Sequence, residues 1–295
     1  MNNHRSIKPS LRSSSLWTLS VILTVVCFTY QDRTGPTYPM EGDFHTRKGA
    51  VHFKFLRSET IGQALKVMLV EPLPESLAAS VRYRRFKSND DWSSLPFKPG
   101  TFEYSRRGRT ETVKGLGAEL PSLKERAGKY EYFVDIGGGK DEMISVTGGQ
   151  PLYARYKGEV PTWALIIHIV VIFASMTFAI RTVLAALVKE RFKGMLRATV
   201  VSLLLGAFLL GPLVQWYAFG VWWSGVPIGY DWTDNKVLIE LMGWILTLLM
   251  NRGERVNRWS VYLAGILTVI VYFIPHSIFG SEYDYTTGSG HGTAG

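Results

Sequence analysis

The stretch PTWALIIHIVVIFASMTFAIRTVLAALV, residues 161–188, decides the fold. Within it, His168 and Arg181 are the two side chains that can carry a charge. A hydrocarbon core about 30 Å thick requires about 20 mostly apolar residues of helix, so this stretch predicts a transmembrane helix. Four further apolar stretches predict the rest of a membrane domain of about five helices: 16–31, 198–220, 233–250 and 259–279.

The first apolar stretch resembles a signal sequence. Three basic residues precede it, Arg5, Lys8 and Arg12. No small-x-small cleavage site follows it, and Cys27 lacks the small residue that a lipoprotein signal has before its cysteine. We therefore predict an uncleaved signal anchor over 16–31, behind a cytoplasmic segment, 1–15. With a single cysteine, the chain excludes an internal disulfide and a multi-cysteine metal site.

The net charge of +9 follows the predicted membrane topology. Basic residues gather before the first helix, between the second and third helices, and between the fourth and fifth helices, whereas the loop 219–236 holds Lys236 alone. This positive-inside pattern predicts a cytoplasmic N-terminus and an extracytoplasmic location for residues 32–160 and for the tail 281–295. The basic excess is explained by topology, so no nucleic-acid partner is required.

Between the first two helices the apolar residues alternate with a period of two, which is typical of half-buried strands. Val51, Phe53 and Phe55 are one such run, and Tyr130, Tyr132, Val134 and Ile136 are another. Turn sequences such as Lys98-Pro-Gly and Gly137-Gly-Gly separate the runs. About seven short strands therefore predict an all-β, immunoglobulin-like sandwich over 32–160. Residues 286–295 are of low complexity and predict a disordered end to the tail.

Two resemblances accompany this pattern. The segments Val81–Phe97 and Ala127–Ile136 resemble central strands of fibronectin type III or immunoglobulin-like domains, over residues 45–158. That resemblance implies a fold and a role in contacts, and no activity. Segments after the first helix, around Gly211–Lys236 and around Ile274–Tyr285, resemble bacterial multi-pass inner-membrane proteins of no assigned activity. The second resemblance implies the bacterial inner membrane.

Polar residues recur at the predicted outer ends of the later helices. His168, Gln215, Glu240 and His276 are expected at one level, and Asp231, Asp234, Glu282 and Asp284 just outside it. Ionisable groups within a span usually face a bundle interior or a cavity. The set therefore suggests a metal site, a proton relay, or haem held by His168 and His276. The alternative is a set of separate structural roles, namely helix caps, hydrogen bonds to neighbouring helices, and a solvated flank.

Three functions remain open at this point. The first is a non-catalytic membrane protein whose sandwich binds a membrane or periplasmic protein. The second is a redox or metal-handling subunit with a metal or haem at the outer face of the helices. The third is a small-solute transporter or a membrane-embedded enzyme. The sequence shows no internal repeat, which argues against a transporter, and no hydrolase motif, which argues against such an enzyme. We favour the first, with no assigned cofactor.

Overall fold

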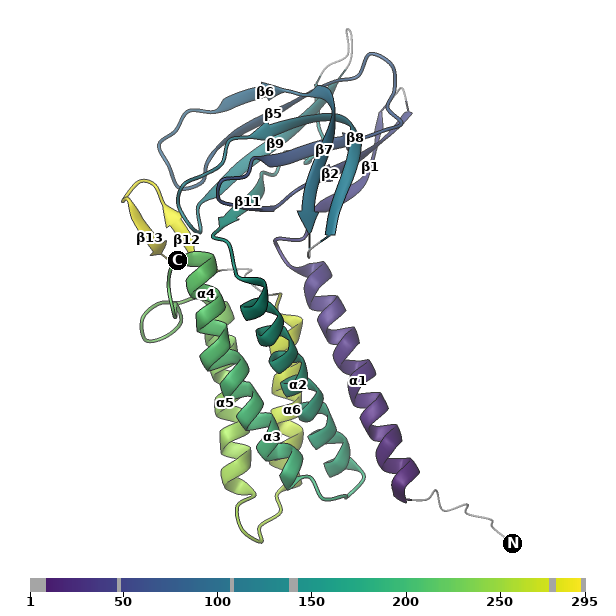
Figure 1. The fold of residues 1–295 in the computed structure, drawn as a ribbon, viewed down its shortest axis with the longest axis vertical. Helices are drawn as coiled ribbons and strands as arrows, with labels where there is room; N and C mark the ends of the chain where they lie inside the picture. Colours follow the sequence, from purple (N-terminus) through teal and green to yellow (C-terminus); the bar gives the residue numbers. More distant parts are fainter. Residues whose placement is uncertain (1–8, 47–48, 107–108, 138–142, 276–279, 293–295) are drawn as a thin grey trace, which may run out of the picture. The chain divides into compact units, whose positions relative to one another are not determined.

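A computed structural model describes residues 9–46, 49–106, 109–137, 143–275 and 280–292. The chain forms two compact units. The helical unit comprises residues 1–35, 160–217 and 221–280. The β domain comprises residues 36–159, 218–220 and the C-terminal segment 281–295. Each unit has its own core, and Figure 1 traces both along the chain.

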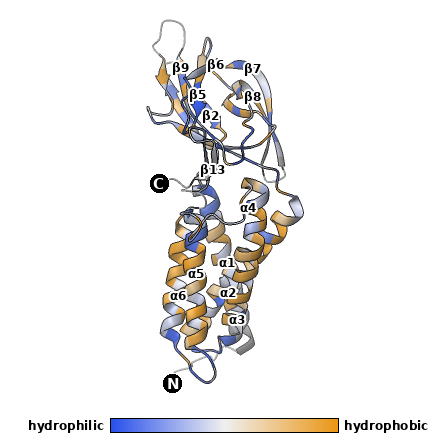
Figure 2. Ribbon diagram, turned by 90° about the vertical axis from the view of Figure 1, so that its left-hand side faces the viewer, coloured by the Kyte–Doolittle hydropathy of each residue, from blue (hydrophilic) through white to orange (hydrophobic). Residues whose placement is uncertain are grey.

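The helical unit follows the apolar stretches of the sequence. Its elements are α1 (Pro9–Thr34), α2 (Thr162–Leu187), α3 (Lys193–Leu203), the π-helical turn η1 (Leu204–Leu210), α4 (Gly211–Phe219), α5 (Trp232–Met250) and α6 (Arg258–Phe273). The elements α3, η1 and α4 form one continuous helical run, Lys193–Phe219. Figure 2 shows these helices largely hydrophobic, with hydrophilic residues at their ends.

Three helical segments of the described chain are long and apolar enough to cross a membrane: Ser13–Thr34, Thr162–Leu187 and Lys193–Phe219. The prediction of a five-span bundle is therefore wrong. Helix α5 carries three charged residues, Asp234, Lys236 and Glu240, within its first half. Helix α6 has 16 residues. At a rise of about 1.5 Å per residue, its length is less than the thickness of a hydrocarbon core, about 30 Å.

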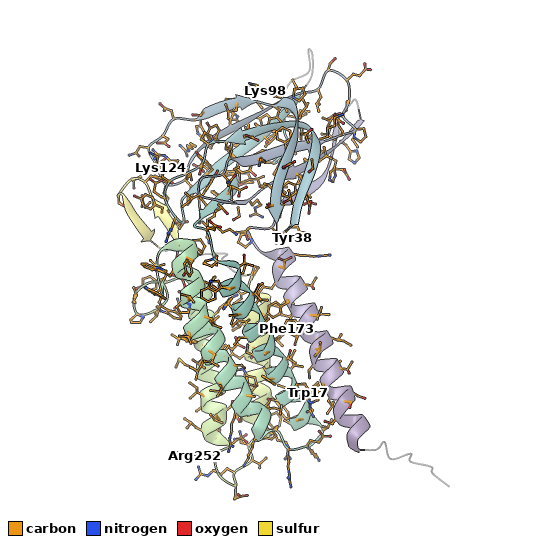
Figure 3. The ribbon with its side chains drawn as sticks, viewed as in Figure 1. Trp17, Tyr38, Lys98, Lys124, Phe173 and Arg252 are labelled. Carbon is orange, nitrogen blue, oxygen red and sulfur yellow. The ribbon has the colours of Figure 1, made fainter. Side chains whose placement is uncertain are left out.

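Small side chains let the helices of this unit approach closely. Helix α2 buries Ala179, Ala185 and Ala186 against the core that α3, α5 and α6 complete. Trp244 of α5 is fully buried there, and its indole N–H donates to the Thr268 hydroxyl of α6 at 2.8 Å. Helix α1 packs on α2 through aromatic pairs, Trp17 with Phe178 and Phe28 with Phe173 (Figure 3, where Trp17 and Phe173 are labelled).

Residues 36–159 of the β domain form two sheets. Their strands are β1 (Met40–Thr46), β2 (Gly49–Phe55), β3 (Ser58–Thr60), β4 (Leu65–Val70), β5 (Ala78–Arg85), β6 (Ser93–Pro96), β7 (Lys98–Arg106), β8 (Arg109–Leu120), β9 (Lys129–Gly137), β10 (Ile144–Ser145) and β11 (Leu152–Lys157). One sheet has the order β1-β2-β4-β8-β7. The other has the order β3-β11-β9-β5-β6, with β10 beside β9 and one parallel pair, β3 with β11.

This arrangement differs from the predicted seven-strand immunoglobulin-like sandwich, and that prediction is wrong. Residues 36–159 follow α1 with eleven strands among the described residues, and their first sheet is built around two hairpins, β1–β2 and β7–β8. The Lys98-Pro-Gly sequence that predicts a turn instead begins β7. Strand β7 is the edge of its sheet, and edge strands are where proline is tolerated.

The alternation of apolar residues places the core between the sheets. Val51, Phe53 and Phe55 of β2 and Tyr130, Tyr132, Val134 and Ile136 of β9 are all buried, whereas their neighbours face outward. The hydroxyl of Tyr132 donates to the Leu56 carbonyl at 3.0 Å. The second predicted turn, after Gly137, falls on residues 138–142, which lie outside the described residues.

The C-terminal segment is ordered as a hairpin, where the sequence predicts a disordered tail. Strand β12 (Glu282–Asp284) pairs with β13 (Ser289–Gly292), and Asp284 closes the turn by accepting hydrogen bonds from the backbone and hydroxyl of Thr286. Two backbone hydrogen bonds attach the hairpin to the β domain, from Tyr283 N to Ala127 O and from Tyr285 N to Lys87 O.

Candidate functional site

Three of the predicted polar residues meet around Ser224 in the helical unit. The Gln215 amide donates to the Ser224 hydroxyl at 2.6 Å and to the Asp234 carboxylate at 3.2 Å. Asp234 also accepts from the backbone N–H of Ser224 at 2.7 Å, and the Ser224 hydroxyl lies 3.2 Å from Asp231. Both carboxylates are buried. This cluster ties the loop before α5 to the start of that helix.

Asp231 has a structural task at the beginning of α5. It is the N-cap, and its carboxylate accepts from the backbone N–H of Thr233 at 2.7 Å. Asp234 lies in the first turn of the same helix. Acidic residues at both positions are stabilised by the unpaired N–H groups and by the positive end of the helix dipole.

Lys236 and Glu240 lie one turn further along α5, and both are buried. The Lys236 ammonium donates to the Ile274 carbonyl at 2.6 Å. That carbonyl stands at the C-terminal end of α6, where Pro275 ends the helix, so the lysine satisfies an acceptor that the helix leaves open. Glu240 is hydrogen-bonded with Thr268, the same residue that accepts from Trp244.

The other predicted ligands do not join this cluster. His168 Nδ1 lies 3.0 Å from the Gly206 carbonyl in η1, so its ring bridges α2 to the π-helical turn. The same carbonyl also accepts from the backbone N–H of Gly211. His276 lies outside the described residues. Among the residues that the structure describes, no group of three His, Cys, Asp or Glu side chains is arranged to hold a metal ion.

Glu282 and Asp284 belong to the β domain. The Glu282 side chain is 3% exposed and lies between two ammonium groups, Lys87 Nζ at 2.5 Å and Lys129 Nζ at 2.6 Å. Burial alone would raise the pKa of Glu282, but the hydrogen bonds from Lys129 and Lys87 outweigh it and hold that pKa below its usual value. Burial lowers the pKa of Lys129 to about 8, and the nearby Arg155 adds to the lowering.

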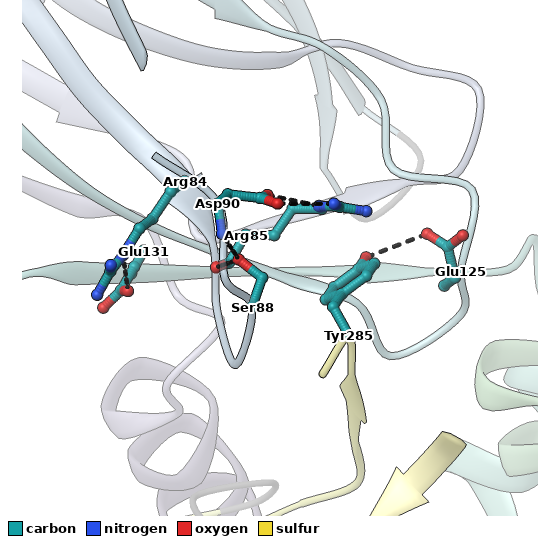
Figure 4. Close-up of polar contacts among 7 residues, drawn as sticks. All are labelled: Arg84, Arg85, Ser88, Asp90, Glu125, Glu131 and Tyr285. Atoms are coloured by element: carbon teal, nitrogen blue, oxygen red, sulfur yellow. Dashed lines mark hydrogen bonds and ion pairs between the residues drawn. The ribbon is translucent and has the colours of Figure 1, made fainter. Parts of the chain in front are cut away.

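Tyr285 makes the second set of contacts between the hairpin and the domain (Figure 4). Its hydroxyl donates to Glu125 at 3.1 Å, and the Arg85 guanidinium lies 4.5 Å from the centre of its ring. Burial and the Glu125 carboxylate raise the pKa of Tyr285, which keeps its hydroxyl a donor. Arg85 is itself fixed by two hydrogen bonds to Asp90, at 2.6 and 2.8 Å.

Sequence reasoning missed a second feature of the β domain, on the outer side of the six-stranded sheet. We call it the arginine–aromatic face: Arg82, Arg84, Trp92 and Phe133. Arg82 lies over the Phe133 ring at 5.2 Å and Arg84 over the Trp92 ring at 4.5 Å, and the two rings are 5.3 Å apart. The signal was present as the outward residues of β5 and β9, but the cross-strand register that joins them is not visible in a single sequence.

No family model, no curated protein and no solved structure matches the chain. The two resemblances suggested by the sequence therefore stay predictions.

Proposed function

We propose that the chain is a non-catalytic membrane protein that presents its β domain to a partner protein through the arginine–aromatic face. The observation that carries this proposal is that the arginine side chains of the face are more exposed than the carboxylates paired with them. The Arg82 side chain is 49% exposed and its partner Asp135 13%, while Arg84 is 35% exposed and its partner Glu131 11%. The guanidinium groups and aromatic rings therefore stand outermost, with the carboxylates beneath them.

This composition is that of an interaction surface. Arginine, tryptophan and other aromatic residues are enriched among the side chains that contribute most binding energy at interfaces. The ion pairs Arg82–Asp135 and Arg84–Glu131 hold each guanidinium in one place before a partner arrives, which reduces the ordering entropy that binding requires. The Trp92 side chain, 41% exposed, supplies apolar area on the same face.

The charge of the face selects the chemistry of the partner. Outward guanidinium edges next to rings are complementary to a protein surface with carboxylates beside aliphatic or aromatic side chains. We therefore propose an acidic, partly apolar protein surface as the partner, in the membrane or the periplasm.

The membrane orientation is part of the proposal. With the basic N-terminus inside, α1 carries the chain outward to the β domain, and α2 followed by Lys193–Phe219 carries it inward and out again. The C-terminal hairpin belongs to the β domain, so it lies on the same side as residues 36–159. We propose the bacterial inner membrane, with both segments periplasmic. A periplasmic alkaline phosphatase fused after Gly295 is expected to be active, and an inactive fusion of normal abundance would contradict this orientation.

Site-specific crosslinking in native membranes tests the face itself. Ser94 of β6 pairs with Arg82 and is exposed, so a photo-crosslinking residue there samples the face without removing one of its members. The matched control is Thr101, an exposed residue of β7 on the other sheet. We expect one protein to be crosslinked from position 94 and not from 101. The product is expected to disappear in an Arg84→Glu, Trp92→Ala variant.

Two outcomes would contradict the proposal. Equal crosslinking from positions 94 and 101 would show that the face has no preferred partner. A product from position 94 that survives Arg84→Glu, Trp92→Ala would show that the guanidinium and the indole do not contribute to binding. Circular dichroism of the purified variant confirms that its β domain is folded.

A further inference from the structure

The C-terminal strand β12 is held by the β domain as a peptide ligand would be held. The backbone N–H of Tyr283 in β12 donates to Ala127 O at 3.1 Å, and that of Tyr285, directly after the strand, donates to Lys87 O at 2.9 Å. The two acceptors are turn residues, Lys87 after β5 and Ala127 before β9, so the segment is held by the carbonyls of two neighbouring loops. Main-chain bonds of this kind fix the direction and register of a segment, and they accept any sequence.

The first side-chain contact makes the site selective for a carboxylate at the position of Glu282. Lys87 and Lys129 both direct their ammonium groups to Glu282, which is almost fully buried between them. Arg155 adds to the positive potential at Lys129. Without a carboxylate at this position the two lysines face each other and their ion pairs are lost, so an apolar or basic side chain is rejected.

The second contact selects a tyrosine three residues further on. Arg85, fixed by Asp90, covers the ring of Tyr285, and Glu125 accepts its hydroxyl hydrogen (Figure 4). Gly128 makes room for this ring, because a Cβ atom there would collide with the Tyr285 hydroxyl and with the Glu125 carbonyl. The site therefore has a pocket for the end of the aromatic side chain as well as a pair of cations.

We propose that this region of the β domain binds an extended acidic segment of the form Glu-x-x-Tyr from a partner protein, and that Glu282–Tyr285 is its resident, displaceable occupant. The resident segment is part of the same chain and so competes at an effective concentration on the order of mM. A partner segment gains access when its local concentration is comparable or when the resident contacts are weakened.

This inference goes beyond the proposed function, since its site differs from the arginine–aromatic face in every residue and fixes a different ligand. Either can fail without the other. Crosslinking from Ser94 reports on the face, whereas the experiment below uses only purified full-length protein and a synthetic peptide.

The test uses a fluorescein-labelled peptide with the sequence of residues 280–288, GSEYDYTTG. Its binding to the full-length chain in detergent micelles is followed by fluorescence anisotropy. In the Glu282→Lys variant the resident segment is repelled by Lys87 and Lys129, and the site is open. We expect this variant to bind the peptide at least tenfold more tightly than the wild type does. A peptide with lysine in place of its glutamate is expected not to bind.

A matched pair of substitutions assigns the binding to the site. Added to the Glu282→Lys variant, Lys129→Glu is expected to abolish binding of the peptide, whereas Lys98→Glu, at an exposed lysine of β7, is expected to leave it unchanged. If Glu282→Lys does not fold, Tyr285→Ala opens the same site by removing the ring contacts, and the same peptide series applies.

Three results would overturn the inference: equal peptide affinity of the wild type and both opened variants, no binding by any folded variant, or equal losses from Lys129→Glu and Lys98→Glu. Light scattering adds a fourth. A wild-type mass that doubles with concentration, and does not double in Tyr285→Ala, would assign the site to a second copy of this chain in place of a partner protein.

Discussion

The two units bury charged groups in different ways. In the β domain, Glu282 is paired with Lys129, 153 positions away in the sequence, and with Lys87. In the helical unit, the buried Asp234 is bound by neutral groups close to it in sequence, the Ser224 backbone and the Gln215 amide. One carboxylate depends on opposite charge and the other on oriented dipoles.

The difference has an energetic consequence. A carboxylate that accepts from neutral donors keeps most of its hydrogen bonds when an amide replaces it, because the amide oxygen accepts in the same place. A carboxylate between two ammonium groups cannot be replaced in this way, since its removal leaves two buried cations without a counter-charge. Neutralising Glu282 is therefore expected to cost much more stability than neutralising Asp234.

The largest effect is expected from a residue that carries no charge. Replacing Trp244 by alanine should destabilise the helical unit by about 3–5 kcal/mol, because it removes a fully buried ring from the contact of α5 with its neighbours. Thermal unfolding in detergent, followed by circular dichroism, measures the loss. Trp244→Phe keeps most of the volume and removes only the bond to Thr268, for about 1 kcal/mol. Equal losses in the two variants would show that the polar contact, and not packing, holds this unit together.

The second largest effect is expected at Glu282, the ion-paired carboxylate of the β domain. Glu282→Gln should weaken hairpin docking by about 2–3 kcal/mol. This is less than the full cost of breaking a buried ion pair, because the hairpin can be released and the lysines then become exposed to water. Proteolysis of the C-terminal segment in the native protein measures release. Asp284→Asn is the matched control, since that carboxylate accepts from Thr286 and Thr287 within the turn of the hairpin. Equal cleavage rates in the two variants would contradict the assigned role of Glu282.

Acid should release the hairpin by the same route. The docked Glu282 has a lower pKa than the released segment, so the released form takes up a proton more readily. Docking is therefore at full strength above the ordinary glutamate pKa of about 4.3 and is lost as the pH falls through the lower, docked value. Cleavage of the segment by an acid-active protease should rise between about pH 5 and pH 3 in the wild type. The rise should be absent in Glu282→Gln, and its persistence there would assign it to another group.

The sequence predicts more of the helical unit than of the β domain, because the features that define the helices are local. The apolar stretches and the acidic start of α5 are local features, and each acts within a few residues of its position. The sequence predicts that this helical stretch begins at residue 233, two residues after the observed N-cap Asp231. The pairing of Glu282 with Lys129, the β7–β8 hairpin and the arginine–aromatic face depend on residues brought together by the register of distant strands. Period-two alternation gives the face on which a side chain lies but not its neighbour.

A moderate effect is expected at the α5 cap. Asp231→Ala removes the acceptor of the Thr233 N–H and should destabilise the helical unit by about 1 kcal/mol. Asp231→Asn retains an oxygen in the same place and should recover most of that loss. Hydrogen exchange at the first turn of α5 localises the effect. An asparagine variant as unstable as the alanine variant would mean that the charge of Asp231, and not its capping oxygen, stabilises the helix.

The smallest effect is expected at Asp234 in the helical unit. Asp234→Asn removes a buried charge whose partners in the Ser224 cluster are neutral, and the amide oxygen can accept from the Ser224 N–H and the Gln215 amide as the carboxylate does. It also removes the repulsion between two buried carboxylates that approach the same serine hydroxyl. Against these stands the loss of one favourable charge at a helix N-terminus, about 0.3–1 kcal/mol. The terms nearly cancel, so the unfolding midpoint should change by no more than a few degrees. A loss as large as that of Glu282→Gln would show that Asp234 is held by a cation, and the neutral cluster around Ser224 would then be an incomplete description of its surroundings.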